Sequence, residues 1–172
     1  MEARKVIAAF IMLSVFASGF AQETSKKAQR EQKKTEKQQQ IEALINSNEF
    51  VFEATYVLPQ GGQMINLTGS SYTLKFHNDT IESYLPFYGR AYSVDYGGDG
   101  GIKFKGKPDE YKVVTPKNGR GYEINATIKG PKDYYKIHLS VSTDGGATLI
   151  VDSNQRSSIS YRGDIEKLEE VK

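Results

Sequence analysis

The chain has 172 residues, no cysteine, and a net charge of +2 that is spread unevenly along it. The absence of cysteine excludes disulfides, thiolate catalysis, thiolate metal sites and the lipid-modified cysteine of bacterial lipoproteins. Residues 39–172 hold 15 basic and 17 acidic side chains, a balance of −2, which argues against a nucleic-acid-binding domain. This length suits a single domain with one hydrophobic core.

Residues 1–21 have the pattern of a cleavable secretory signal peptide. Two basic residues are followed by an uncharged apolar run from Val6 to Phe16. The run is far shorter than the ~20 residues that a helix needs to cross a bilayer. Small side chains precede the predicted cleavage site between Ala21 and Gln22. We therefore expect a periplasmic or secreted protein that does not span the membrane.

Residues 22–40 are polar and charged, and Ala28 is their single apolar residue. Six Lys or Arg side chains and three Glu side chains alternate between residues 23 and 38. Lys, Gln and Glu favour helix, but no face of this segment is apolar enough to be buried. The pattern predicts a solvated, partly helical tether. The alternative is a basic arm that touches anionic envelope surfaces or nucleic acid, and the interleaved glutamates weaken it.

A short amphipathic helix is predicted over residues 41–48. Ile41, Leu44 and Ile45 have the i, i+3, i+4 spacing of one helical face. The polar residues that follow predict an end near Ser47. The apolar stripe is expected to dock on the domain.

From residue 49 to residue 166 the apolar period changes to two, which is typical of β-strands. The first segment has Phe50, Phe52, Ala54 and Tyr56 on one face. Further segments are centred near Ile65, Leu74, Ser83, Lys103, Val113, Asn125, His138, Leu149 and Ser160. Turn-forming residues separate them. The pattern predicts an all-β domain, a single antiparallel meander that closes into a small barrel or sandwich, with a charged tail at 167–172.

The segment 82–104 is unusually rich in tyrosine and glycine. A tyrosine-lined loop with an arginine is a candidate surface for a ligand or partner. The predicted binding residues are Tyr84, Tyr88, Arg90, Tyr92, Asp95, Tyr96 and Arg156. A structural alternative is that the tyrosines cover the open end of a barrel while the glycines allow tight turns. Arg156 is likewise a candidate either for an anion anchor beside Arg90 or for a structural pair with Asp152.

Three blocks of sequence resemble the signature blocks of DUF4251, a family of exported proteins of unknown function from Bacteroidetes-type bacteria. The blocks are Tyr-Leu-Pro-Phe-Tyr-Gly-Arg-Ala-Tyr (84–92), Gly-Gly-Ile-Lys-Phe (100–104) and Asp-Ser-Asn-Gln-Arg-Ser-Ser-Ile-Ser-Tyr-Arg-Gly (152–163). The resemblance covers Phe50 to Ile165. It implies a bacterial envelope setting, and it implies no activity, substrate or catalytic residue.

Few residues are candidates for chemistry. The two histidines, His77 and His138, are expected in a turn and on the polar face of a strand. No catalytic residue, metal site or cofactor is predicted, and a hydrolase is the less favoured alternative. We expect a non-enzymatic domain that binds a small-molecule or lipid ligand or an envelope protein. The rival hypothesis is a structural or assembly protein of the envelope with a filled core. A cavity would discriminate between the two hypotheses.

Overall fold

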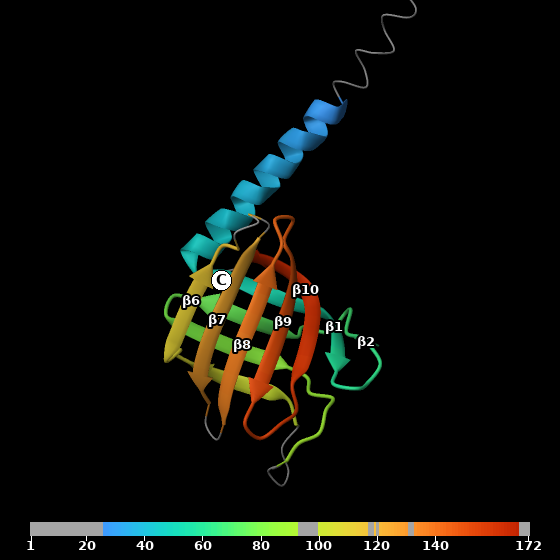
Figure 1. The fold of residues 1–172 in the computed structure, drawn as a ribbon, viewed down its shortest axis with the longest axis vertical. Helices are drawn as coiled ribbons and strands as arrows, with labels where there is room; N and C mark the ends of the chain where they lie inside the picture. The colour runs from blue at the N-terminus through green and yellow to red at the C-terminus, as the bar shows by residue number, and fades with distance from the viewer. Residues whose placement is uncertain (1–25, 93–99, 117–118, 120, 131–132, 169–172) are drawn as a thin grey trace, which may run out of the picture. The chain divides into compact units, whose positions relative to one another are not determined.

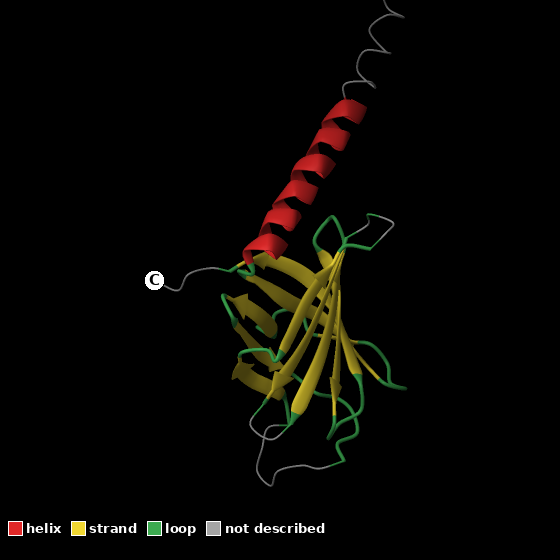
Figure 2. Cartoon of the chain, turned by 60° about the vertical axis from the view of Figure 1, so that its left-hand side comes forward, coloured by secondary structure: helices red, strands yellow, loops and turns green. Residues whose placement is uncertain are grey.

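The computed structural model describes residues 26–92, 100–116, 119, 121–130 and 133–168. The predicted signal peptide lies outside the described residues, as do Asp95 and Tyr96. The chain divides into two compact units, Met1–Lys37 and Gln38–Lys172. The described part of the first unit is helical, and the second unit contains the end of that helix and all the β-strands (Figures 1 and 2).

One α-helix covers residues 26–47. It is longer than the short helix predicted over 41–48, because Lys, Gln and Glu continue a helix and residues 26–40 contain no Gly or Pro to interrupt it. The helix ends at Asn48, which adopts a left-handed backbone with φ 53°. Asparagine tolerates this conformation and often follows the last turn of a helix. Ser47 Oγ also donates a hydrogen bond of 2.8 Å to the Leu44 carbonyl.

Ten antiparallel strands form one sheet in the described residues, in agreement with the predicted all-β class. They are β1 (Phe50–Pro59), β2 (Ile65–Asn66), β3 (Thr73–His77), β4 (Thr80–Leu85), β5 (Ile102–Gly106), β6 (Glu110–Val114), β7 (Tyr122–Lys129), β8 (Tyr134–Val141), β9 (Gly146–Ser153) and β10 (Ile159–Lys167). Every alternating segment found in the sequence lies in one of these strands. The β10 strand extends one residue into the predicted tail, to Lys167.

The sheet is curled into a half-barrel. Its order is β5-β4-β3-β1-β10-β9-β8-β7-β6, with β2 paired to β1. The meander is therefore interrupted at one place, where the first strand lies between β3 and the last strand. The β5 and β6 strands are the two ends of this order, so the described sheet stays open between them. In Figure 1 the strands β6 to β9 lie in front, and strands of the other half of the sheet cross behind them.

The β1–β10 pairing joins residues that are 100 or more positions apart. Phe50 pairs with Lys167 and Pro59 with Ile159, with a register shift between Ala54 and Tyr56. Gly163 lies at this irregularity, where a Cβ atom would stand 1.8 Å from the Glu53 carbonyl oxygen. Only glycine permits so close an approach of the two backbones.

The interior of the half-barrel is packed with apolar side chains. Its largest fully buried members are Tyr161, Phe50, Phe52, Phe76, Ile41, Ile45, Leu74, Leu85, Ile102, Ile124, Ile128 and Leu139. Aromatic rings stack between the neighbouring strands β1 and β3, with centroids 4.4 Å apart for Phe50–Phe76, and across the interior between β5 and β8, with centroids 4.7 Å apart for Phe104–Tyr135. The predicted helical stripe is confirmed, because Ile41 and Ile45 are buried in this core and Leu44 packs against it.

Candidate functional site

The tyrosine-rich segment is divided between a strand and a connection. Tyr84 belongs to β4, and residues 86–92 form an irregular stretch after that strand. The side chains of Tyr84, Tyr88 and Tyr92 are 47%, 44% and 72% exposed, and Arg90 is exposed as well. Four of the seven predicted binding residues are therefore accessible to a partner.

The irregular stretch is held in place by the segment before β10. Ala91 forms an isolated antiparallel bridge with Arg156. The Tyr92 amide donates to the Gln155 carbonyl at 2.7 Å, and the Ser157 amide donates to the Arg90 carbonyl at 2.9 Å. The Arg90 amide in turn donates to Ser157 Oγ at 3.2 Å. These backbone contacts fix the direction of residues 90–92 at the protein surface.

Arg156 has a structural role. Its Nη1 donates to the carbonyls of Gly100 and of Gly101, the latter at 3.1 Å. The guanidinium carbon also lies 5.1 Å from the centroid of the Phe87 ring. Of the two hypotheses for Arg156, the structure therefore favours the structural one, although through backbone carbonyls and an aromatic ring rather than through Asp152.

Tyr161 anchors the same region from inside the core. Its side chain is fully buried, and its hydroxyl donates to the Pro86 carbonyl at 2.6 Å. Burial raises the pKa of Tyr161, which keeps the hydroxyl protonated as a donor. In addition, Tyr84 pairs with Lys103 and Leu85 with Ile102 between β4 and β5. The first two signature blocks and the third, which follows them by almost 50 residues, thus form one contact network.

Tyr84 lies in a small aromatic group on the outer face of the sheet. Its ring stacks on Tyr72 with centroids 5.8 Å apart, and Lys103 Nζ lies 4.3 Å from its centroid. Such stacking restricts the ring and leaves about half of its surface open to solvent. A rigid, exposed aromatic ring loses little conformational entropy when a partner covers it.

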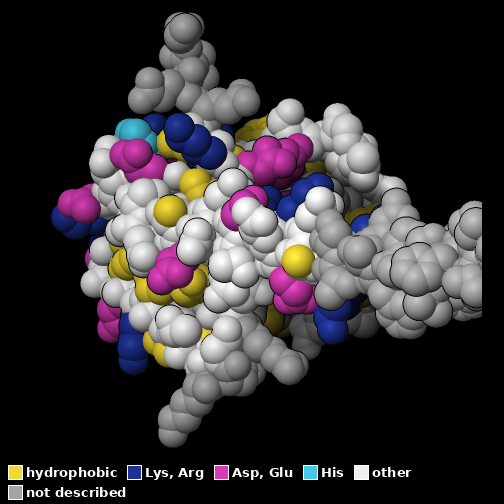
Figure 3. All heavy atoms as spheres, turned by 90° about the horizontal axis from the view of Figure 1, so that it is seen from above, with side chains coloured by type: hydrophobic (Ala, Val, Ile, Leu, Met, Phe, Trp, Pro, Cys, Tyr) yellow, Lys and Arg dark blue, Asp and Glu magenta, His cyan; other side chains and the backbone are white. Residues whose placement is uncertain are grey.

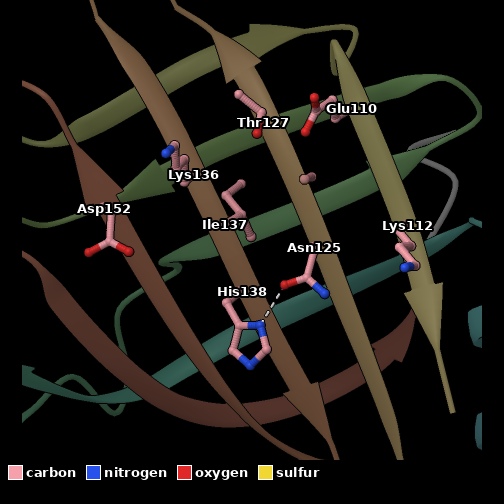
Figure 4. A pocket seen from close by; sticks show the side chains of 9 residues that line it. Glu110, Lys112, Asn125, Thr127, Lys136, Ile137, His138 and Asp152 are labelled. Carbon is pink, nitrogen blue, oxygen red and sulfur yellow. Dashed lines mark hydrogen bonds between the residues drawn. The ribbon is translucent and has the colours of Figure 1, made fainter. Parts of the chain in front are cut away.

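Hollows lined by described residues include three that do not involve Tyr84, Tyr88 or Arg90. One of about 430 Å³ borders the β1–β2 turn and β10, and one of about 150 Å³ lies between Phe76, Pro108 and Tyr111. The third, of about 390 Å³, is a polar groove across β6 to β9 (Figure 4). Figure 3 shows basic and acidic side chains interspersed on another view of the surface, with apolar side chains in small patches.

Sequence reasoning missed the polar groove. His138 and Asn125 face each other across β7 and β8, with His138 Nδ1 2.7 Å from Asn125 Oδ1. Lys136 and Asp152 are cross-strand partners beside them. The sequence contained the information needed to find this pair. The short connection between β7 and β8 sets the register of the two strands and so brings residues 125 and 138 together. The alternation of the two strands had already assigned both residues to the polar face.

The groove is poorly suited to hydrolysis by paired carboxylates. Its acids, Glu110 and Asp152, are on β6 and β9, which are three strand spacings apart. Their backbones are thus separated by roughly 14 Å, and Figure 4 shows the two carboxylates at opposite sides of the groove instead of side by side as in the carboxylate pair of glycosidases.

Among the described residues, no group of three His, Asp or Glu side chains is arranged to hold a metal ion. No helix in this part of the chain is long and apolar enough to cross a bilayer.

The fold and the surface define a small antiparallel half-barrel with a filled interior and exposed tyrosines beside the segment that precedes β10. The chain belongs to the family described as "Domain of unknown function (DUF4251)", whose model matches residues 32–165. This finding confirms the resemblance seen in the three sequence blocks.

A solved structure has a similar fold. It is the crystal structure of a DUF4251 family protein from Bacteroides eggerthii DSM 20697, with a TM-score of 0.61 and 21% sequence identity. The similarity covers 76% of this chain and 87% of the Bacteroides chain. No curated protein was found to be similar to the chain.

Proposed function

We propose that the protein is an exported, non-enzymatic binding domain of the bacterial envelope that contacts a partner protein through Tyr84, Tyr88, Arg90 and Tyr92. The observation that carries the proposal is the exposure of three tyrosines on a segment whose backbone is fixed by hydrogen bonds. Tyrosine and arginine contribute strongly to protein interfaces, and a fixed backbone lowers the entropy cost of binding.

Because the interior is filled, we place the binding site on the outer surface of the half-barrel. Barrels that carry a small molecule keep an internal cavity, whereas the described interior here is occupied by Phe, Leu, Ile and Tyr side chains. A partner protein that covers the exposed tyrosines is therefore favoured over a lipid or small molecule held inside the barrel. Arg156 supports this surface indirectly, since its guanidinium is engaged by Gly100, Gly101 and Phe87.

Site-specific photo-cross-linking in intact cells of the host tests the contact surface. A photoreactive phenylalanine in place of Tyr92 is expected to form a discrete adduct, and the added substitution Tyr88→Ser should reduce it several-fold. The same probe in place of Tyr134, which is 43% exposed on β8, serves as the matched control. Equal adducts from both positions, or none from Tyr92, would contradict the proposal.

The export of the protein is tested separately. Mass spectrometry of the periplasmic fraction is expected to find a chain that begins at Gln22. An intact Met1 terminus on the periplasmic protein would overturn the cleavage hypothesis.

The filled interior also favours a second candidate, a structural or assembly protein of the envelope. The two candidates differ in what they require of the exposed tyrosines. A purely structural protein needs its fold, so the triple variant Y84S/Y88S/Y92S would preserve its envelope phenotype. The binding hypothesis predicts that this variant behaves like a deletion although it remains folded by circular dichroism.

A further inference from the structure

In the helix of the first unit, the basic side chains lie on one side of the axis, although basic and acidic residues are mixed along the sequence. Residues 26–37 are helical, and all their side chains are exposed. Successive residues of an α-helix are rotated by about 100°, so each position has a definite direction around the axis. On this basis every basic residue of the segment falls within one arc of about 120°. These residues are Lys26, Lys27, Arg30, Lys33, Lys34 and Lys37.

No other residue of 26–37 lies in this arc, which we call the cationic stripe. The two acidic residues of the segment, Glu31 and Glu36, fall outside it. The glutamates that interleave with the lysines along the sequence are therefore separated from most of them around the helix. Interleaving along the sequence therefore does not neutralise the stripe on the helix surface.

Internal pairing leaves most of the stripe without a counter-charge. Glu31 lies 3.8 Å from Lys34, and both side chains are largely exposed, so this pair is weak. Glu36 accepts a hydrogen bond of 3.1 Å from Gln32. Within the described residues, the remaining five basic side chains of the stripe have no carboxylate partner.

The helix offers charge and almost nothing apolar. Ala28 is the single apolar residue in 26–37. A coiled coil needs a repeating apolar seam, and an interfacial helix that inserts into lipid needs an apolar face. Neither is present, so the stripe is suited to a contact that is electrostatic and stays at the surface of its partner.

We infer that the cationic stripe binds peripherally to the anionic headgroups of a lipid bilayer. The axis distance from Lys26 to Lys37 is roughly 16 Å at 1.5 Å per residue. A straight one-sided row of cations matches a flat layer of negative charge, because all its members approach the plane together. Each Lys or Arg close to such a surface contributes about 1 kcal/mol, a fivefold change in affinity. The inference is independent of the partner proposed for the tyrosines.

Vesicle co-sedimentation tests the inference. The protein purified from the host envelope is mixed with vesicles of phosphatidylcholine alone or of phosphatidylcholine with phosphatidylglycerol. We expect binding to the anionic vesicles only, and weaker binding as salt is raised. The variant K26Q/R30Q/K33Q/K37Q should bind several hundred-fold more weakly, since it lacks four cations. All variants keep residues 1–25 unchanged, so differences between them report on the stripe.

A permuted helix is the matched control. Exchanging Arg30 with Gln29, Lys33 with Gln32 and Lys37 with Gln39 keeps the composition, the net charge and nearly the same helix propensity. The exchange moves three cations out of the stripe, and we expect at least tenfold weaker binding with unchanged helix content by circular dichroism. Binding equal to that of the unmodified protein would overturn the inference. So would equal binding to neutral vesicles, or tighter binding to duplex DNA or polyglutamate than to anionic vesicles at the same salt.

Discussion

The helix over residues 26–37 and the β domain obtain their structures by different means. Each helical residue depends on neighbours within about four positions. The β domain depends on pairs such as Thr55 and Arg162, whose hydrogen bond of 3.1 Å joins residues 107 positions apart. The helix buries nothing and carries concentrated positive charge, whereas residues 39–172 bury a core with a charge of only −2. Substitutions should therefore change binding in the first region and stability in the second.

The largest effect is expected where β1 and β10 come closest. Gly163→Ala places a Cβ 1.8 Å from the Glu53 carbonyl oxygen, which forces two backbones apart at the β1–β10 pair in the middle of the sheet. We expect a loss of at least about 3 kcal/mol in the free energy of unfolding, or no folded protein. Urea denaturation followed by circular dichroism measures this.

Gly146→Ala is the control for that substitution, because Gly146 pairs with Asp164 one position from Gly163. The nearest atom to its added Cβ is Ser142 Oγ at 3.4 Å, an ordinary contact. This variant should stay within about 1 kcal/mol of the unmodified protein. If the two variants were equally stable, the close β1–β10 contact at Gly163 would not be critical for the stability of the sheet.

The second effect concerns the contact network of the three signature blocks. Tyr161→Phe removes the hydroxyl that donates to the Pro86 carbonyl and leaves a half-buried acceptor unpaired. The expected cost is about 1–2 kcal/mol. Tyr134→Phe, on an exposed side chain of β8, should cost almost nothing. Equal melting temperatures for the two variants would show that the hydroxyl contact does not hold residues 86–92.

Local patterns predicted much of this fold, and long-range pairing accounts for what they missed. The period of two located the strands, and most of them have one face on the core, as Ile124 and Leu139 do, whereas β6 is exposed along most of its length. The same pattern contains nothing about which strands pair across the sequence, so the position of β1 beside β10 could not be predicted. The network from Ala91 to Arg156 was hidden for the same reason. The cationic stripe was missed although its evidence is local, because the charges were considered along the chain instead of around a helix.

A third, smaller effect depends on pH. Burial raises the pKa of Tyr111 to about 12, above its ordinary value of 10.0. The unfolded chain therefore ionises first, and the stability that Tyr111 contributes is complete below pH 10 and is lost as pH rises toward 12. Because this side chain is 36% exposed, solvent screening keeps the loss small.

Tyr111→Phe isolates this contribution. At neutral pH the variant should be less stable by about 1 kcal/mol, because it lacks the 2.7 Å hydrogen bond from the hydroxyl to Asn48 Oδ1. Above pH 10 the unmodified protein loses stability that the variant does not lose, so the difference should shrink. Urea titrations at neutral and alkaline pH measure both values. A difference that stays constant would contradict the assignment.

The smallest effect on stability is expected from the deletion of residues 26–37, although it changes more of the chain than any of the single substitutions. These side chains are all exposed, so their loss uncovers no apolar surface of the core. The melting temperature should stay within about 1 °C, and the urea m-value should be unchanged because m follows the surface exposed on unfolding. Binding to anionic vesicles should be lost in the same variant. A large fall in melting temperature would mean that the helix supports the domain, and retained vesicle binding would mean that the lipid contact lies elsewhere. Only the combination of intact stability and lost binding fits a helix that serves as a binding element and a β domain that folds without it.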